Sequence, residues 1–143
     1  MRLLAGDRVY IDANIFIKAA EGSEPSCQDL LLAVQRGQVL ATTSELMNAE
    51  VLVGALKQNR VDLVAIYERL FGPESPLDVT PADRDLLRQA AYVQALAGGR
   101  LPDAIHVATA LAGACRCLVT SDVNLRTTSS MPLLLLPDLA AAL

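Results

Sequence analysis

The chain has 143 residues, of which 52% are hydrophobic and 20% charged, and its formal net charge at pH 7 is −4. This length predicts a single domain covering residues 1–143 and leaves little room for a second one. The negative charge is not typical of proteins that bind polyanions through a broad basic surface, unless bound divalent metal neutralises several carboxylates.

The composition also bears on where the protein works. No stretch approaches the roughly 18–20 apolar residues that a membrane helix requires, and the N-terminus lacks the pattern of a secretion signal. The cysteines Cys27, Cys115 and Cys117 lack the spacing of a zinc site, so we expect reduced, structural thiols. These features predict a cytoplasmic protein with no membrane association. The mean hydropathy of +0.35 is high for a short chain and favours an unusually apolar core or an apolar surface covered by a partner.

The first half of the chain alternates between predicted strands and helices. In chain order we expect a strand at residues 9–11, helices at 14–20 and 26–36, a strand at 39–41, and helices at 43–58 and 61–71. Ser26 is the expected cap of the second helix. Thr42, followed three residues later by Glu45, has the pattern of a capping box for the third.

The second half continues in the same way. We expect a strand at residues 77–79, helices at 81–97 and 102–114, and strands at 117–120 and 133–136, the last element of the chain. Thr80 is the expected cap of the helix that begins with Pro81. Short apolar strands without alternation, separated by helices, indicate a parallel sheet covered on both faces. The predicted fold class is therefore α/β, a three-layer α/β/α sandwich with a short, mostly parallel central sheet.

Two acidic residues follow predicted strands directly. Asp12 comes after residues 9–11, and Asp122 comes shortly after residues 117–120. In open parallel sheets, ligands bind at the carboxyl ends of the strands, near the point where the strand order reverses, so these two acids can meet there. For either acid alone, capping of the following helix or turn is the simpler interpretation.

Glu50 lies within a predicted helix, and its neighbours three and four positions away are all nonpolar. We therefore expect Glu50 to project from the face that packs on the sheet. Burial of an unpaired carboxylate costs several kcal/mol, so a positive group should lie beside it. Either a bound metal ion or a basic residue such as Lys18 or Arg100 could fill that role.

Asp103 follows Pro102 and opens a helix, where the helix dipole favours an acid in any case. It gains significance only together with the other three. Carboxylates from four separate segments are suitable ligands for Mg²⁺ or Mn²⁺, which can lower the pKa of a bound water and stabilise charge on a phosphate. We therefore expect four residues to be both metal ligands and catalytic groups: Asp12, Glu50, Asp103 and Asp122. Whether they hold one ion or two stays open.

Several polar residues accompany these acids. Asn14, Thr120 and Ser121 are candidates to support Asp12, Asp122 or a metal-bound water. The candidates for substrate contacts are Arg100, Lys18 and Arg126. His106, the single histidine, lies in a mostly apolar helix, and a buried structural position is favoured over a role as ligand or base.

The chain resembles the PIN-domain nucleases, in particular the VapC toxins of VapBC toxin–antitoxin pairs. The segments that carry the resemblance are residues 9–14, 43–52, 101–110 and 118–122. The resemblance implies a PIN-like fold and a Mg²⁺- or Mn²⁺-dependent ribonuclease, with Asp12, Glu50, Asp103 and Asp122 as the acidic set and Asn14 and Thr120 as supporting residues. It also implies a homodimer and inhibition by a small antitoxin protein.

Two other functions are compatible with such a sheet. A phosphatase with Asp12 as nucleophile would need a second acid two residues later, where this chain has Asn14. A non-catalytic PIN-like module that binds RNA or a protein would be indicated by loss of one acid, and none is missing. The sequence thus predicts an endoribonuclease that hydrolyses RNA phosphodiester bonds with metal-activated water and forms no covalent intermediate.

Overall fold

Five parallel strands form the centre of the computed structural model, which describes residues 1–143. The strands are β1 (Arg8–Ile11), β2 (Leu40–Ser44), β3 (Asp78–Thr80), β4 (Cys117–Thr120) and β5 (Leu133–Leu135), in the spatial order β3-β2-β1-β4-β5. In chain order, β2 lies beside β1 and β3 lies beside β2, whereas β4 lies on the other side of β1. The strand order therefore reverses between β1 and β4, which pair with Ile11 level with Val119.

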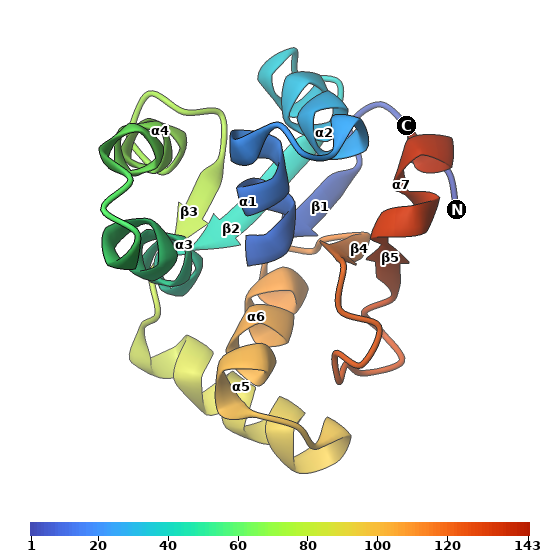
Figure 1. Cartoon of the computed structure of the whole chain (residues 1–143). Helices are drawn as coiled ribbons and strands as arrows, with labels where there is room; N and C mark the ends of the chain where they lie inside the picture. Colours follow the sequence, from blue (N-terminus) through green and yellow to red (C-terminus); the bar gives the residue numbers. More distant parts are fainter.

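Helices cover both faces of this sheet. They are α1 (Ala13–Glu21), α2 (Pro25–Gln35), α3 (Glu45–Lys57), α4 (Val61–Leu70), α5 (Arg84–Ala97), α6 (Leu101–Ala112) and α7 (Leu136–Ala142). Because parallel crossovers are right-handed and the β1–β2 and β3–β4 connections run in opposite directions, α1 with α2 and α5 with α6 belong to opposite faces. Figure 1 shows α1 and α2 over the sheet and α5 packed with α6 below it. The predicted α/β/α sandwich is confirmed.

The central strands are buried because both of their faces are covered. Val9, Tyr10 and Ile11 of β1 have no exposed surface, and every residue of β4 is buried. Residues of β1 alternate between the two layers, and Tyr10 faces α6, where its hydroxyl contacts His106. The cysteines are all free and buried, as the sequence predicted. None of the helices combines the length and apolar character needed to span a bilayer.

Two predicted helix caps are wrong because β2 and β3 extend further than expected. Thr42 stays within β2, and the cap of α3 is Ser44, whose Oγ accepts a hydrogen bond of 3.0 Å from the backbone N–H of Met47. Thr80 stays within β3, where it lies level with Ser44, and Asp83 caps α5 instead. Pairing between two strands thus outweighs local capping preference.

The ends of two other elements also differ from the prediction. Ser26 is buried inside α2, since Pro25 takes the first helical position and leaves Glu24 as the cap. At the C-terminus, the expected last strand stops at Leu135, and a further helix, α7, follows. Pro137 lies in its first turn, where proline starts a helix as readily as it interrupts a strand.

Candidate active site

Asp12 lies at the point where the strand order reverses, between the ends of β1 and β4. It caps α1, and its Oδ1 accepts a hydrogen bond of 2.8 Å from the N–H of Ala13. Its Oδ2 accepts a hydrogen bond of 2.6 Å from the hydroxyl of Thr120, the last residue of β4. Both oxygens are therefore oriented by the backbone or by a buried side chain, and each keeps a lone pair for a further partner.

Thr120 also connects Asp12 to Asp122. Its Oγ1 accepts a hydrogen bond of 3.0 Å from the N–H of Asp122 while its hydroxyl hydrogen goes to Asp12. Oδ1 of Asp122 accepts a bond of 2.9 Å from the N–H of Asn124, which fixes the turn after β4. One buried threonine thus holds two acidic residues that are far apart in the chain. Ser121, the other proposed supporting hydroxyl, makes no comparable contact.

Asp103 faces these two residues from the first turn of α6. Partial burial raises the pKa of its carboxyl, and the nearby negative charges of Asp12 and Asp122 raise it further. The positive charge of Arg100 and the ring of His106 offset only part of this effect. Asp103 is therefore a partly buried carboxylate within electrostatic reach of two others, where its ionised form is disfavoured and an added cation would stabilise it.

No arginine or lysine neutralises this acidic site. The ion pairs of the structure are Arg8 with Asp78, Arg60 with Asp62, Arg116 with Asp7, and His106 with Glu50. Asp12, Asp103 and Asp122 belong to none of them. Their oxygens are the hard ligands that Mg²⁺ and Mn²⁺ prefer, so the chemistry of this donor set fits a divalent ion. The side chains are nevertheless not arranged as a closed coordination shell: no three acidic, histidine or cysteine side chains are grouped as metal ligands.

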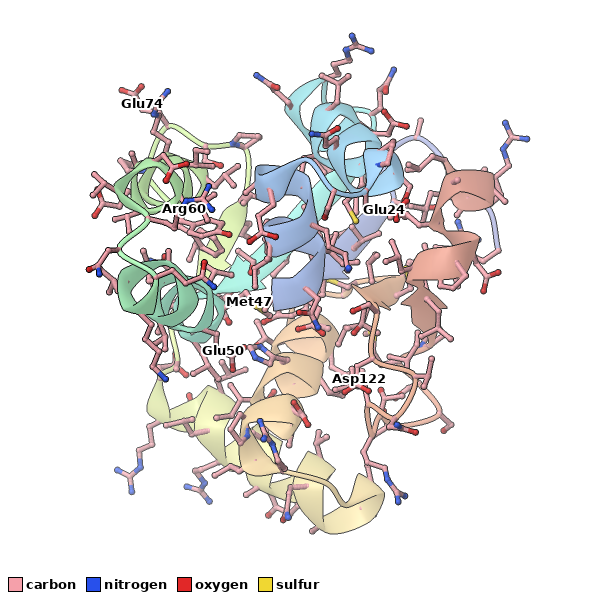
Figure 2. All side chains as sticks on the ribbon, in the orientation of Figure 1. Glu24, Met47, Glu50, Arg60, Glu74 and Asp122 are labelled. Carbon is pink, nitrogen blue, oxygen red and sulfur yellow. The ribbon has the colours of Figure 1, made fainter.

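Glu50 lies apart from the other three acids. Figure 2 shows Glu50 on one side of α6 and Asp122 on the other. Oε1 of Glu50 lies 3.1 Å from Nε2 of His106, and Nδ1 of that ring lies 2.6 Å from the hydroxyl of Tyr10. Tyr10 is two residues before Asp12, and the charges of both Asp12 and Glu50 act on it. Glu50 is therefore linked to the acidic site through Tyr10 and His106.

The expected environment of Glu50 differs from the observed one in two respects. The buried face of α3 carries Met47, Val51 and Ala55, whereas the side chain of Glu50 keeps 35% of its surface exposed. Its positive neighbour is His106 rather than Lys18 or Arg100. His106 is buried, with 3% of its surface exposed, as predicted, but the sequence analysis did not foresee its contact with Glu50.

The other proposed residues differ in their relation to the acidic site. Asn14 is exposed on the first turn of α1 and makes no hydrogen bond with Asp12, whose partners are Ala13 and Thr120. Lys18 lies in the last turn of α1 and acts electrostatically on Cys27 in α2. No ion pair of the structure joins the side chain of Lys18 to the acidic residues.

Arg100 and Arg126 are better placed. Arg100 immediately precedes α6, and its charge acts on Asp103. The side chain of Arg126 packs on Gly99, so closely that a β-carbon added there would lie 2.9 Å from Cγ of Arg126. Gly99 has a positive φ of 81°, which a glycine adopts without strain. The two arginines therefore lie beside each other at the edge of the acidic site.

A cavity of about 950 Å³ lies elsewhere. It is bounded by α2, α4 and the loop of residues 72–77, and none of the candidate acids lines it. The acidic site lies instead at the carboxyl ends of β1 and β4, where Asp12 and Asp103 are half-buried and Asp122 is exposed. Exposure of this kind suits a large substrate better than a small molecule, which would be enclosed.

Comparison with known proteins places the chain in a family. The family model described as "PIN domain" matches residues 9–130, most of the chain. No curated protein matches.

Several solved structures share the fold. VapBC2 of Rickettsia felis, bound to a DNA fragment from its promoter, superposes with a TM-score of 0.67 at 16% identity, covering 89% of this chain and 97% of the other. A toxin–antitoxin complex from Klebsiella pneumoniae gives 0.64 at 20% identity, over 82% and 88%. VapC20 of Mycobacterium tuberculosis, a toxin that cleaves the sarcin–ricin loop, gives 0.61 at 11% identity, over 77% and 86%. At these identities the likeness shows a shared fold.

Proposed function

The chain belongs to the PIN domain family, and on that premise we propose that it is a metal-dependent endoribonuclease that hydrolyses RNA phosphodiester bonds. The observation that carries the proposal is the set of Asp12, Asp103 and Asp122 at the reversal of the strand order. Partial burial and the charges of Asp12 and Asp122 raise the pKa of Asp103, and none of the three carboxylates has an arginine or lysine as ion-pair partner. Crowded acids of this kind are unfavourable unless the function of the site needs them.

Each residue has a part in this proposal. Asp12, Asp103 and Asp122 would bind Mg²⁺ or Mn²⁺, with Thr120 orienting Asp12 and Glu50 linked to the site through His106 and Tyr10. The bound ion would supply positive charge next to the scissile phosphate and make a water molecule more acidic. Arg100 and Arg126 would bind the RNA backbone at the edge of the site. Water would attack phosphorus directly and one RNA oxygen would leave, so no bond to the protein forms.

Hydrolysis is tested by incubating the protein with a structured RNA, with Mg²⁺, with Mn²⁺ or with EDTA. Asp12→Asn is the informative variant because asparagine caps a helix as well as aspartate does, so the fold is kept while the charge is lost. Asp85→Asn, in the exposed first turn of α5, is the matched control. The proposal expects cleavage by the wild type and Asp85→Asn only, and none with EDTA. RNA binding without cleavage would instead support a non-catalytic module.

We further propose that the protein works in the cytoplasm as the toxin of a toxin–antitoxin pair. Among the similar structures, the one from Klebsiella pneumoniae is a toxin–antitoxin complex and the one from Rickettsia felis is VapBC2. The prediction is arrest of growth on expression of the wild type but not of Asp12→Asn, with relief by a small protein encoded beside it. Growth that continues with the wild type would argue against a toxin.

A homodimer is the proposed assembly. Large apolar side chains are exposed on α3, α4 and α5 and at the start of α6: Val53, Leu56, Val61, Ile66, Leu87, Tyr92, Leu96 and Leu101. A second copy of the chain could cover exposed apolar side chains of this kind. Light scattering after size exclusion should give twice the mass of one chain, 15.2 kDa. A mass equal to one chain would exclude the dimer.

A further inference from the structure

We propose that Tyr10 and His106 are positioning residues that fix the carboxylate of Glu50 relative to the acidic site through a chain of hydrogen bonds with one direction. The functional part of this inference rests on the proposed nuclease activity, whereas the direction of the chain can be measured in the protein alone. The chain of hydrogen bonds begins at the N-terminus of α3, passes through residues of β1 and α6, and returns to α3 at Glu50.

Four consecutive contacts form the chain. The N–H of Met47 lies 3.0 Å from Oγ of Ser44, and that Oγ lies 2.9 Å from the hydroxyl oxygen of Tyr10. The same hydroxyl lies 2.6 Å from Nδ1 of His106, and Nε2 of the ring lies 3.1 Å from Oε1 of Glu50. Each distance is within hydrogen-bond range, and the Tyr10–His106 contact is short.

The first and last groups set the direction of every bond between them. The N–H of Met47 can only donate and the carboxylate of Glu50 accepts, so Ser44 receives a hydrogen bond at one end and Nε2 of His106 carries a hydrogen at the other. If Tyr10 donated to Ser44, the hydroxyl hydrogen of Ser44 would have no acceptor in a buried position. Ser44 therefore donates to Tyr10, Tyr10 donates to Nδ1, and His106 carries its hydrogen on Nε2.

Because these groups are buried, each of them must find its hydrogen-bond partner within the protein. Tyr10 and Ser44 have no exposed surface and His106 has 3%, so water cannot replace a missing partner. Bonds that point in one direction polarise one another, so the contact with Glu50 gains from the three before it.

The chain of hydrogen bonds joins the elements that carry the acidic residues. Tyr10 is two residues before Asp12 on β1, and His106 is one helical turn after Asp103 on α6. Figure 2 shows Met47 and Glu50 on α3, close to α6. One oxygen of Glu50 is held by His106 while the side chain keeps 35% of its surface exposed, so the carboxylate can still contact a ligand. Tyr10 and His106 thus fix Glu50 relative to Asp12 and Asp103.

The direction can be read by ¹⁵N NMR of the imidazole ring, because His106 is the single histidine and gives the sole imidazole signals. At pH 8 without metal or RNA, the expected spectrum shows hydrogen on Nε2 and an unprotonated Nδ1 that accepts a hydrogen bond. Tyr10→Phe should move the Nδ1 signal toward the chemical shift of a ring nitrogen that accepts no hydrogen bond. Tyr67 is a buried tyrosine of α4, and Tyr67→Phe should leave the signal unchanged. Hydrogen on Nδ1 in the wild type, or an unmoved signal in Tyr10→Phe, would overturn the proposal.

Kinetics test the positioning role separately. Tyr10→Phe and His106→Phe should lower kcat for RNA by about 10–100-fold with little change in KM, as loss of a group that orients a ligand residue does. His106→Gln, whose amide can still donate to Glu50, should recover much of that loss, and Tyr67→Phe should retain the wild-type kcat. Equal loss in His106→Gln and His106→Phe would contradict the role. If the wild type cleaves no RNA, the nuclease proposal fails. The NMR result alone then decides whether the hydrogen bonds run in the proposed direction.

Discussion

The hydroxyl of Thr120 donates a hydrogen bond of 2.6 Å to Oδ2 of Asp12 and joins the ends of two adjacent parallel strands that are 108 residues apart in sequence. The contact exists because Ile11 and Val119 are level in the β1–β4 pair, which places the next residue of each strand side by side. Strand register therefore decides the orientation of Asp12.

Thr120→Val should lower the rate of RNA cleavage by about 10–100-fold, because the side chain keeps its shape but no longer donates to Asp12 or accepts from the N–H of Asp122. Thr120→Ser should retain most of the activity. The matched control is Thr109→Val: Thr109 is also buried, but its hydroxyl bonds only to the carbonyl of Ile105 within α6. Equal effects of the two valine substitutions would show that Thr120 does not act through Asp12.

Asp103→Asn should stabilise the fold at neutral pH while abolishing cleavage. The pKa of Asp103 is raised in the folded protein, so its ionised form opposes folding above that pKa. The penalty disappears as the pH falls through the raised pKa toward 3.8, the ordinary pKa of an aspartate side chain. Urea denaturation of wild type and variant should thus differ near pH 7 and converge at acidic pH. A variant that is less stable at pH 7 would contradict the crowding of acids. Asp85→Asn controls for the loss of a first-turn acid.

Gly99→Ala should weaken RNA binding by displacing Arg126. A methyl group at Gly99 would lie 2.9 Å from Cγ and 3.1 Å from Cβ of Arg126, so the arginine must move. Gly98→Ala is the control, because its φ of 76° is similarly positive but the added methyl contacts nothing within 4 Å. Both should lose about 1 kcal/mol of stability from backbone strain. Only Gly99→Ala should also raise KM for RNA; an equal KM in the two variants would exclude Arg126 from the binding surface.

Leu139→Ala should destabilise the protein by about 2–5 kcal/mol, since Leu139 of α7 is fully buried and its loss leaves a cavity. The backbone of α7 also accepts a hydrogen bond of 2.8 Å from Leu3 through Ala142, which ties the two ends of the chain together. Chemical denaturation measures the effect, and Leu4→Ala, on an exposed side chain, serves as the control. A change below that of the control would mean that α7 is not docked in solution.

The fold could be predicted because its strands are apolar on both faces, a pattern that few other architectures produce. The positions of Asp12 and Asp122 followed from the same pattern, since each comes just after a strand. The starts of α3 and α5 could not be predicted from local sequence, because pairing of Ser44 with Thr80 extends both strands past the expected caps. Such pairing is a property of the assembled sheet.

The contact between Glu50 and His106 could not be predicted from the sequence for a similar reason. The two residues are 56 positions apart, and their contact depends on how α3 and α6 pack on either side of Tyr10. A partial signal was present, because His106 falls one turn after Asp103 and so shares its side of α6. Reading that spacing together with Tyr10 two residues before Asp12 would have suggested a polar connection between the three elements.

The most direct test is titration of the protein with Mn²⁺, followed by electron paramagnetic resonance of free and bound ion, in the wild type and in Asp12→Asn, Asp103→Asn and Asp122→Asn. The account predicts that the wild type binds Mn²⁺, that each of the three substitutions weakens binding, and that Asp85→Asn does not. Wild-type binding that all three substitutions leave intact, or no binding at all, would contradict a divalent-ion site built from these carboxylates.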